Sequence, residues 1–245
     1  MFKLFIIIIL LTYPLKSQFL SIYDIKKDNY PLMEAKMFFV DENGNQILDI
    51  SKDEMFLTEN GTERNIIDIS CPQKDAKAAI SSVLTIDRSG SMKGKNIKLA
   101  KSAAINWVNN MPLDKSECAI TSFNGVNFYD QDFTQDEDLL IQKINNIKAE
   151  GGTSYNAGFY EPMAGALEVL KTSKHKKIIV FLTDGKSFVD QDIIIKKANE
   201  LNASVYCVTL NIECPEPLKE ISENTGGLWF EEIFTENELI KIYDI

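Results

Sequence analysis

The sequence predicts an α/β protein in which a mainly parallel sheet is covered by helices on both faces, in the doubly wound, Rossmann-like arrangement. A small all-β module is expected in front of it. From Lys74 onward, apolar runs of strand length alternate with segments of helical periodicity, which is typical of a parallel sheet. Before that residue, apolar runs are separated by Asn-Gly turns, which favour β-hairpins. With 245 residues and 44% hydrophobic content, the chain can form one sizeable core and a small companion domain.

Residues 1–17 have the pattern of an export signal. Lys3 gives a positive start, Leu4 to Leu11 are uninterruptedly apolar, and Ser17 lies near the expected cleavage point. This apolar run is too short to cross a bilayer, and no later run has membrane length. We therefore expect a mature chain without a transmembrane segment that is secreted or held at the cell surface.

Residues 18–75 are expected to form the small β module. A strand at Ala35–Val40 is followed by a turn at residues 41–45, and a strand at Glu54–Thr58 is followed by a turn at residues 59–61. Both turns contain Asn-Gly, the strongest short-range signal for a hairpin. A module this short makes a marginal sandwich, so we expect it to lean on neighbouring sequence.

Residues 76–245 are expected to form the α/β domain, which begins with a continuous apolar strand at Ile80–Ile86. In the next segment, Ile97, Ala100, Ala104 and Trp107 recur at helical spacing. These residues predict a helix at Lys95–Asn110. The expected strands that follow lie around Cys118, at Val126–Gln131 on the edge of the sheet, at Lys177–Leu182, through Cys207 and at Leu228–Glu231. The expected helices are one opened by a Thr134–Glu137 capping box, one at Asn156–Lys171, one at Asp190–Leu201, a short one from Pro217 to the glycines at 226 and 227, and a final one capped at Thr235.

Polar residues follow the predicted strands where a doubly wound sheet binds its ligands, outside the carboxyl ends of the strands. Asp87, Ser89 and Ser91 follow the first strand, Asp184 follows the strand at Lys177–Leu182, and Thr153 comes after two glycines before a helix. Two carboxylates and three hydroxyls are hard oxygen donors. They suit Mg²⁺ or Mn²⁺, with Ca²⁺ as an alternative, and disfavour Zn²⁺.

The stretch from about Ala78 to Ile245 resembles a von Willebrand factor type A domain. The residues that carry the resemblance match that family's metal-ion-dependent adhesion site at every signature position: Asp87, Ser89, Ser91, Thr153 and Asp184. The resemblance implies strand order 3-2-1-4-5-6 with one antiparallel edge strand. It also implies that the three hydroxyls bind the metal directly and that the carboxylates bind it directly or through water. The N-terminal module is similar, less specifically, to immunoglobulin-like domains that precede such domains in exported bacterial proteins.

The resemblance implies adhesion or protein binding, and the charge of the chain agrees with it. With a net charge of −10 and no basic cluster, the sequence excludes a nucleic-acid footprint. A metal held mainly by hydroxyls would keep an electrophilic position that favours a carboxylate from a protein partner. Without the metal, Asp87 and Asp184 would repel that same group. Whether the ligand is a protein or a polysaccharide stays open at this point.

Two other functions are weighed. An acyl-transfer site would need His175 near Ser89, but His175 precedes a strand and so lies at the opposite, amino edge of the sheet. A metal-dependent phosphotransferase or hydrolase could use Asp87 as its nucleophile, but Ser89 stands where the general acid of haloacid-dehalogenase-like enzymes would be. We therefore expect no enzyme activity. A domain whose metal is only structural is a further alternative.

The four cysteines do not resemble a disulfide-dense scaffold. Cys118 and Cys207 lie within apolar strands, and we expect both to be small buried hydrophobic residues. Cys71 and Cys214 lie beside prolines in loops. The sequence leaves their disulfide state open.

Overall fold

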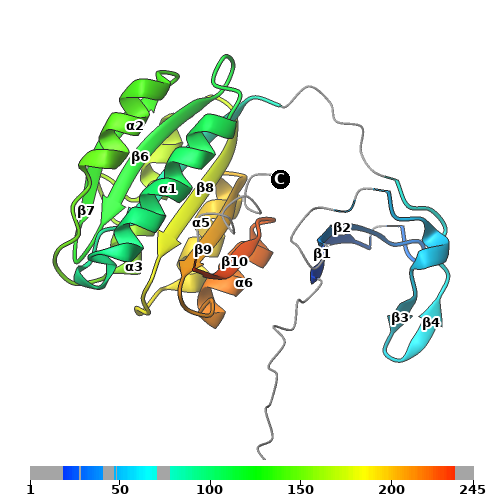
Figure 1. Ribbon diagram of the computed structural model, residues 1–245. Helices are drawn as coiled ribbons and strands as arrows, with labels where there is room; N and C mark the ends of the chain where they lie inside the picture. Colours follow the sequence, from blue (N-terminus) through cyan, green and yellow to red (C-terminus); the bar gives the residue numbers. More distant parts are fainter. Residues whose placement is uncertain (1–18, 28, 41–46, 48, 71–77, 235–245) are drawn as a thin grey trace, which may run out of the picture. The chain divides into compact units, whose positions relative to one another are not determined.

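The structure is a computed structural model that describes residues 19–27, 29–40, 47, 49–70 and 78–234 (Figure 1). The chain divides into two compact units, residues 1–69 and 70–245. Within the described ranges, no helix is long and apolar enough to cross a membrane. The export signal, the acidic turn at residues 41–45, Cys71 and the final predicted helix lie outside the described residues.

The first unit contains two separate pairs of antiparallel strands. Strand β1 (Phe19–Lys26) pairs with β2 (Glu34–Val40), and β3 (Leu57–Glu59) pairs with β4 (Thr62–Arg64). The Asn-Gly turn at residues 60 and 61 joins the second pair, as predicted, and both of its residues have positive φ, 49° and 76°. The strand predicted from Glu54 starts later.

The late start of β3 has a local cause. Residues Lys52–Glu54 form a short 3-10 helix, η1, and the Glu54 carboxylate accepts a hydrogen bond of 2.9 Å from the backbone N–H of Ser51. This capping holds Glu54 in a turn and keeps it out of the strand.

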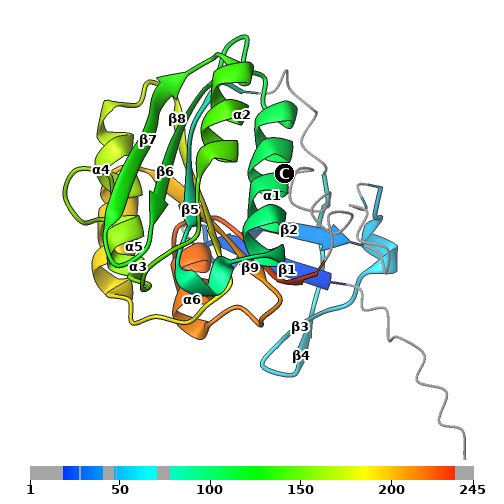
Figure 2. The same cartoon turned by 60° about the vertical axis from the view of Figure 1, so that its left-hand side comes forward.

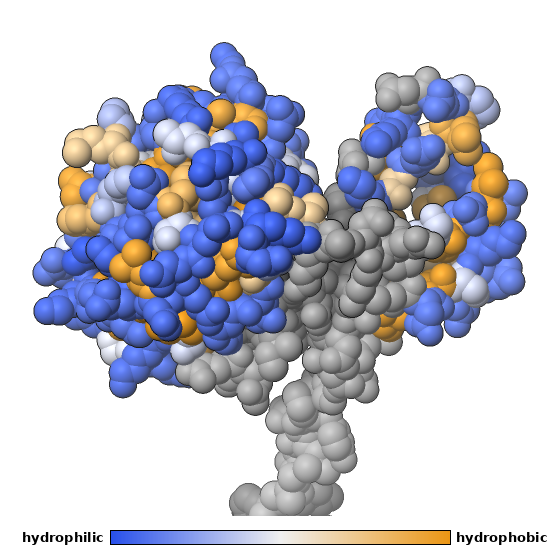
Figure 3. Space-filling view, turned by 90° about the horizontal axis from the view of Figure 1, so that it is seen from above, coloured by the Kyte–Doolittle hydropathy of each residue, from blue (hydrophilic) through white to orange (hydrophobic). Residues whose placement is uncertain are grey.

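The first unit buries little of its surface. Among the residues of this unit whose burial is described none is buried, and Ile25, Tyr30, Phe56 and Ile67 are more than half exposed. Hydrophobic residues accordingly lie on the surface of this unit, the right-hand body in Figure 3. Isolated two-stranded sheets are marginally stable, and the described strands do not build a sandwich with a core.

The second unit contains the predicted six-stranded sheet, with strand order β10-β9-β8-β5-β6-β7. All neighbours are parallel except β6 and β7, which form an antiparallel pair at one edge. Counted along this unit, the order is the predicted 3-2-1-4-5-6. The strands are β5 (Ile80–Asp87), β6 (Glu117–Phe123), β7 (Asn127–Thr134), β8 (Lys176–Thr183), β9 (Ala203–Leu210) and β10 (Trp229–Ile233).

Helices cover both faces of this sheet, as Figure 2 shows. One face carries α1 (Lys95–Asn110) and α2 (Glu137–Asn146). The other carries α3 (Tyr155–Phe159), α4 (Ala166–Val169), α5 (Gln191–Glu200) and α6 (Glu216–Asn224). Two short 3-10 helices, η2 (Gly90–Met92) and η3 (Leu170–Thr172), complete the unit. The helix bounds predicted for α1 agree with the structure, and Ala100, Ala104 and Trp107 are buried.

Two helix predictions were wrong. The predicted capping box at Thr134 is not formed, because β7 continues to Thr134 and Asp136 is the residue that caps α2, accepting 2.9 Å from the backbone N–H of Leu139. The single helix predicted at Asn156–Lys171 is broken between α3 and α4. Pro162 cannot donate a backbone hydrogen bond, and Met163 adopts a positive φ of 78°.

An aromatic cluster fills the space between α3 and the sheet. The Phe181 ring stacks on Phe159 at 4.0 Å and on Phe123 at 4.8 Å between ring centroids, and Tyr155 meets Phe181 edge-on at 5.3 Å. Gly158 lets α3 approach this closely, since a Cβ placed there would lie 2.7 Å from Phe123 and 2.9 Å from Phe181. The cluster therefore fixes the position of α3, which follows directly after Thr153.

We expect Gly158→Ala to lower the free energy of unfolding by about 1–3 kcal/mol, because the added methyl group overpacks the aromatic cluster. Urea denaturation followed by tryptophan fluorescence measures this loss. Gly125→Ala is the matched control, because nothing lies within 4 Å of a Cβ at that position. Equal stability of the two variants would show that α3 is not held by close packing.

Candidate metal centre

The loops after β5 and β8 bring four of the five predicted site residues together at the carboxyl edge of the sheet. This edge lies at the lower left of the sheet in Figure 1, where α3 and the start of α1 are also found. The Ser89 and Ser91 hydroxyls are 3.1 Å apart, and Ser91 Oγ donates to Asp184 Oδ1 over 2.8 Å. Asp87 is the last residue of β5 and starts the loop that carries both serines.

Asp87 is completely buried, and both of its carboxylate oxygens accept hydrogen bonds. The backbone N–H of Ser89 donates to Oδ1 over 2.7 Å, and Thr183 Oγ1 donates to Oδ2 over 2.6 Å. Burial raises the pKa of the Asp87 carboxyl above its ordinary value, although these hydrogen bonds oppose the rise. The nearby Asp184 carboxylate raises the Asp87 pKa further.

Thr153 is brought to the same edge by its backbone. The N–H of Gly90 donates to the carbonyl of Gly151 over 2.9 Å, and Ser187 Oγ donates to the carbonyl of Thr153 over 3.2 Å. A Cβ on Gly90 would lie only 3.1 Å from that Gly151 oxygen, so the glycine permits the close approach. Among the described residues, the Thr153 hydroxyl makes no hydrogen bond to the other four site residues.

The two site carboxylates have no basic partner. Within the described part of the chain, no lysine or arginine forms an ion pair with Asp87 or Asp184. Arg88, next to Asp87, is engaged elsewhere. Its Nε donates to the carbonyl of Lys148 over 3.0 Å, and its Nη2 pairs with Glu150 at 3.2 Å. Two carboxylates are thus held close together without a direct ion pair to a basic side chain of the described residues.

The site opens to solvent on one side. Ser91 is exposed, whereas Asp87, Ser89 and Asp184 are buried. An ion bound by this set of oxygens would therefore be reached from the Ser91 side.

Two asparagines that the sequence analysis did not identify support the site. Asn96 Nδ2 donates to Asp184 Oδ2 over 2.5 Å, and Asn211 Nδ2 donates to Asn96 Oδ1 over 2.8 Å. Both residues carried a usable signal. Asn211 directly follows the carboxyl end of β9, and Asn96 lies in the first turn of the helix that follows the serine loop. Thr183, which precedes Asp184, likewise has a defined role as donor to Asp87.

The other candidate residues lie apart from this centre. The backbone N–H of His175 donates to Ser81 Oγ over 3.0 Å at the amino edge of the sheet, as predicted. Cys118 and Cys207 are buried free thiols, also as predicted, and Cys214 is a third. Burial raises the pKa of the Cys207 thiol to about 12, so this thiol is inert at neutral pH.

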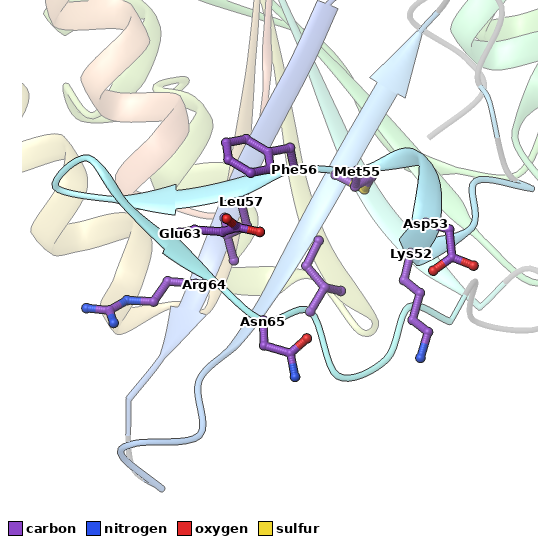
Figure 4. A pocket seen from close by; sticks show the side chains of 9 residues that line it. Lys52, Asp53, Met55, Phe56, Leu57, Glu63, Arg64 and Asn65 are labelled. Carbon is purple, nitrogen blue, oxygen red and sulfur yellow. The ribbon is translucent and has the colours of Figure 1, made fainter.

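No competing centre is found in the described part of the chain. Its His, Cys, Asp and Glu side chains form no group of three or more that could hold a metal ion. An open hollow of about 580 Å³ in the first unit is lined by Lys52, Phe56 and Arg64 among others. Figure 4 shows that the side chains of Lys52 and Arg64 point in different directions. The polar groups that line this hollow therefore do not converge on one ligand position.

Comparison with known proteins identifies the second unit. A sequence profile of the von Willebrand factor type A domain matches residues 83–242. Among solved structures, von Willebrand factor type A from Catenulispora acidiphila superposes with a TM-score of 0.58 at 19% identity, covering 68% of this chain and 41% of that chain. The chain thus spans about two-fifths of the length of that protein. No curated protein matches the sequence.

Two pilus proteins share the fold as well. The vWF domain of the type V pili tip protein Mfa5 from Porphyromonas gingivalis has a TM-score of 0.54 at 15% identity, covering 69% of this chain and 94% of that chain. The PilB minor pilin from Streptococcus sanguinis has a TM-score of 0.54 at 11% identity, covering 95% of this chain and 78% of that chain.

We expect Thr183→Val to destabilise the metal-free protein by about 1–3 kcal/mol, because the buried Asp87 carboxylate loses a hydrogen-bond donor at nearly constant side-chain volume. Urea denaturation in EDTA measures the loss. Thr85→Val is the matched control, since the buried Thr85 hydroxyl bonds only the neutral Thr121 hydroxyl, at 3.0 Å. A larger loss in Thr85→Val than in Thr183→Val would contradict the role given to Thr183.

Proposed function

The chain belongs to the von Willebrand factor type A family, and from this premise we propose that it is an exported binding protein that recognises a partner through a divalent metal ion. The ion is held by Asp87, Ser89, Ser91, Thr153 and Asp184. One observation carries the proposal: two buried carboxylates lie together with the Ser89 and Ser91 hydroxyls, and among the described residues no lysine or arginine forms an ion pair with either carboxylate. A cation is the group that such a site lacks.

The donor set fits Mg²⁺ or Mn²⁺ best. Carboxylate and hydroxyl oxygens are hard ligands, and the described part of the site offers neither thiolate nor imidazole. Asp87 supplies the buried charge, and its orientation is fixed by Ser89 and Thr183. Asn96 orients Asp184 in the same way. Such supporting hydrogen bonds hold ligands in place and raise metal affinity.

The proposed ligand is an acidic side chain of a protein partner. When bound, a divalent metal would supply a positive charge beside Asp87 and Asp184 that attracts a carboxylate of the partner. In the absence of that charge, Asp87 and Asp184 repel a carboxylate. Recognition of an acidic partner by an acidic chain then depends on the cation, and a nucleic acid is not a suitable partner for a chain of net charge −10.

The geometry disfavours the enzyme alternative. A nucleophilic Asp87 would need an exposed oxygen, but the residue is fully buried and both oxygens accept hydrogen bonds. His175 lies at the opposite edge of the sheet from Ser89 and cannot serve it as a base. We therefore propose a binding role without catalysis.

Export is part of the proposal. It rests on the basic start and apolar run of residues 1–17 and places the mature chain outside the cell or on its surface. The pilus proteins that share the fold are surface structures by name, which agrees with this location.

We expect Mg²⁺ to stabilise the protein by about 2.7 kcal/mol at a hundredfold excess over its dissociation constant.

Thr153→Ala should weaken Mg²⁺ binding at least about tenfold. Loss of a residue that supports a metal ligand typically lowers metal affinity by about that factor, and loss of a ligand itself should lower it at least as much. Isothermal titration calorimetry measures the affinity. Thr172→Ala, at the amino edge, is the control. Identical thermal melts in Mg²⁺ and EDTA would remove the metal from the function, and partner binding that persists in EDTA would make the metal structural only.

We also expect no turnover of a phosphomonoester such as p-nitrophenyl phosphate with Mg²⁺ present, because Asp87 is fully buried and so out of reach of a substrate phosphate. A colorimetric assay of the purified chain tests this. Activity that disappears in Asp87→Asn but persists in Thr172→Ala would revive the phosphotransferase alternative.

A further inference from the structure

Three large apolar side chains, Val126, Met163 and Phe188, are 56%, 90% and 77% exposed in loops at the carboxyl edge of the second unit. A fourth, Phe234, directly follows β10 and is 42% exposed. We call Val126, Met163 and Phe188 the apolar rim. In contrast, the described loops at the amino edge, at residues 112–116, 172–175, 200–202 and 225–228, expose no large hydrophobic side chain. Apolar exposure in the loops is therefore concentrated at the edge that carries the candidate metal centre.

Hydrogen bonds tie the loops of Val126 and Met163 together. Asn127, next to Val126, donates from Nδ2 to the carbonyls of Ala157, Glu161 and Pro162 over 3.0, 3.1 and 3.1 Å. Pro162 directly precedes Met163. One side chain thus holds α3 and the start of the break that precedes α4.

The loops of Met163 and Phe188 are joined in the same way. Asp190 Oδ2 accepts from Asn156 Nδ2 and from the Tyr160 hydroxyl, both over 2.7 Å. In return, Asn156 Oδ1 accepts from the backbone N–H of Asp190 over 3.0 Å. Apolar side chains on loops held this firmly are preorganised, so a partner that covers them loses little conformational entropy on binding.

The rim borders the metal centre directly. Ser187, next to Phe188, donates from Oγ to the carbonyl of Thr153 over 3.2 Å. On the other side, the N–H of Asn124 donates to the carbonyl of Val126 over 2.9 Å, and the side chain of Asn124 lies against Gly151. The rim and the site residues are therefore parts of one surface.

The surroundings of the site favour an acidic partner. Lys93 and Lys95 follow the serine loop and Lys186 follows Asp184, and all three are exposed. These positive charges flank the site in a chain whose net charge is −10. Complementary charge steers an acidic partner to this edge.

Building on the proposed function, we propose that the apolar rim is the second half of a two-part binding surface, and that its partner is a protein segment in which a bulky apolar side chain lies close to a carboxylate. The carboxylate meets the metal centre, and the apolar side chain is buried on Phe188 and Met163. A polysaccharide would be matched by hydrogen-bonding groups, whereas valine, methionine and phenylalanine side chains match an apolar peptide side chain.

The test is a selection from a random-peptide display library against the full chain in Mg²⁺. We expect enriched peptides to contain Asp or Glu near Phe, Leu, Ile or Met. An enriched peptide, labelled and measured by fluorescence anisotropy, should bind the Phe188→Ser/Met163→Ser double variant at least about tenfold more weakly, because the burial of one large side chain is lost. Mg²⁺ affinity of the double variant should stay unchanged. Tyr129→Ser is the control, since Tyr129 is exposed on β7 outside the rim.

Each outcome decides a separate point. Enrichment of acidic residues without an apolar preference, or no enrichment at all, overturns the role of the rim. An apolar preference that persists in the double variant overturns it as well. If peptides need the rim but bind equally well in EDTA, the rim stands and the metal-dependent recognition under "Proposed function" fails.

Discussion

The carboxyl edge of the second unit depends on the placement of one buried charge. Asp87 ends the central strand and has no solvent exposure, so its carboxylate must be satisfied by the protein. The backbone N–H of Ser89 and the Thr183 hydroxyl do this, and in doing so they fix the serine loop and the end of β8 relative to each other. Asp184 then follows at hydrogen-bonding distance from Ser91. The geometry of the centre thus follows from the hydrogen bonds that the buried Asp87 carboxylate requires.

The remaining loops are arranged around that core. Arg88 donates a hydrogen bond to the Lys148 carbonyl and pairs with Glu150, both in the segment before Thr153. It therefore forms no ion pair with Asp87 or Asp184 in the described part of the chain. An arginine that turned inward would neutralise the site and remove its need for a metal. The direction of one side chain therefore decides whether the proposed metal site stays available or is closed by an ion pair.

Much of this organisation could be predicted from the sequence. The strands of the second unit are continuous apolar runs, and the rule that ligands bind after parallel strands pointed to Asp87, Ser89, Ser91 and Asp184. What could not be predicted depended on tertiary contacts. Thr134 and Asp136 are both good caps, and the continuation of β7 to Thr134 decided between them. The break within residues 156–171, by contrast, was readable from the sequence, because a proline such as Pro162 inside a helical pattern ends or kinks the helix. Asn96 supports Asp184 across 88 positions of sequence, a pairing that no local pattern encodes.

The strand order also governs when the centre can form during folding. The central strand β5 pairs with β6 and with β8, and the bond from Thr183 to Asp87 joins residues 96 positions apart. Contacts of such long range carry a high loop-closure entropy and form slowly. As the chain emerges from its amino terminus, the serine loop stays without its partner until β8 has followed and docked. If a metal binds at this centre, its binding would therefore follow the docking of β8 and could not help to nucleate the sheet.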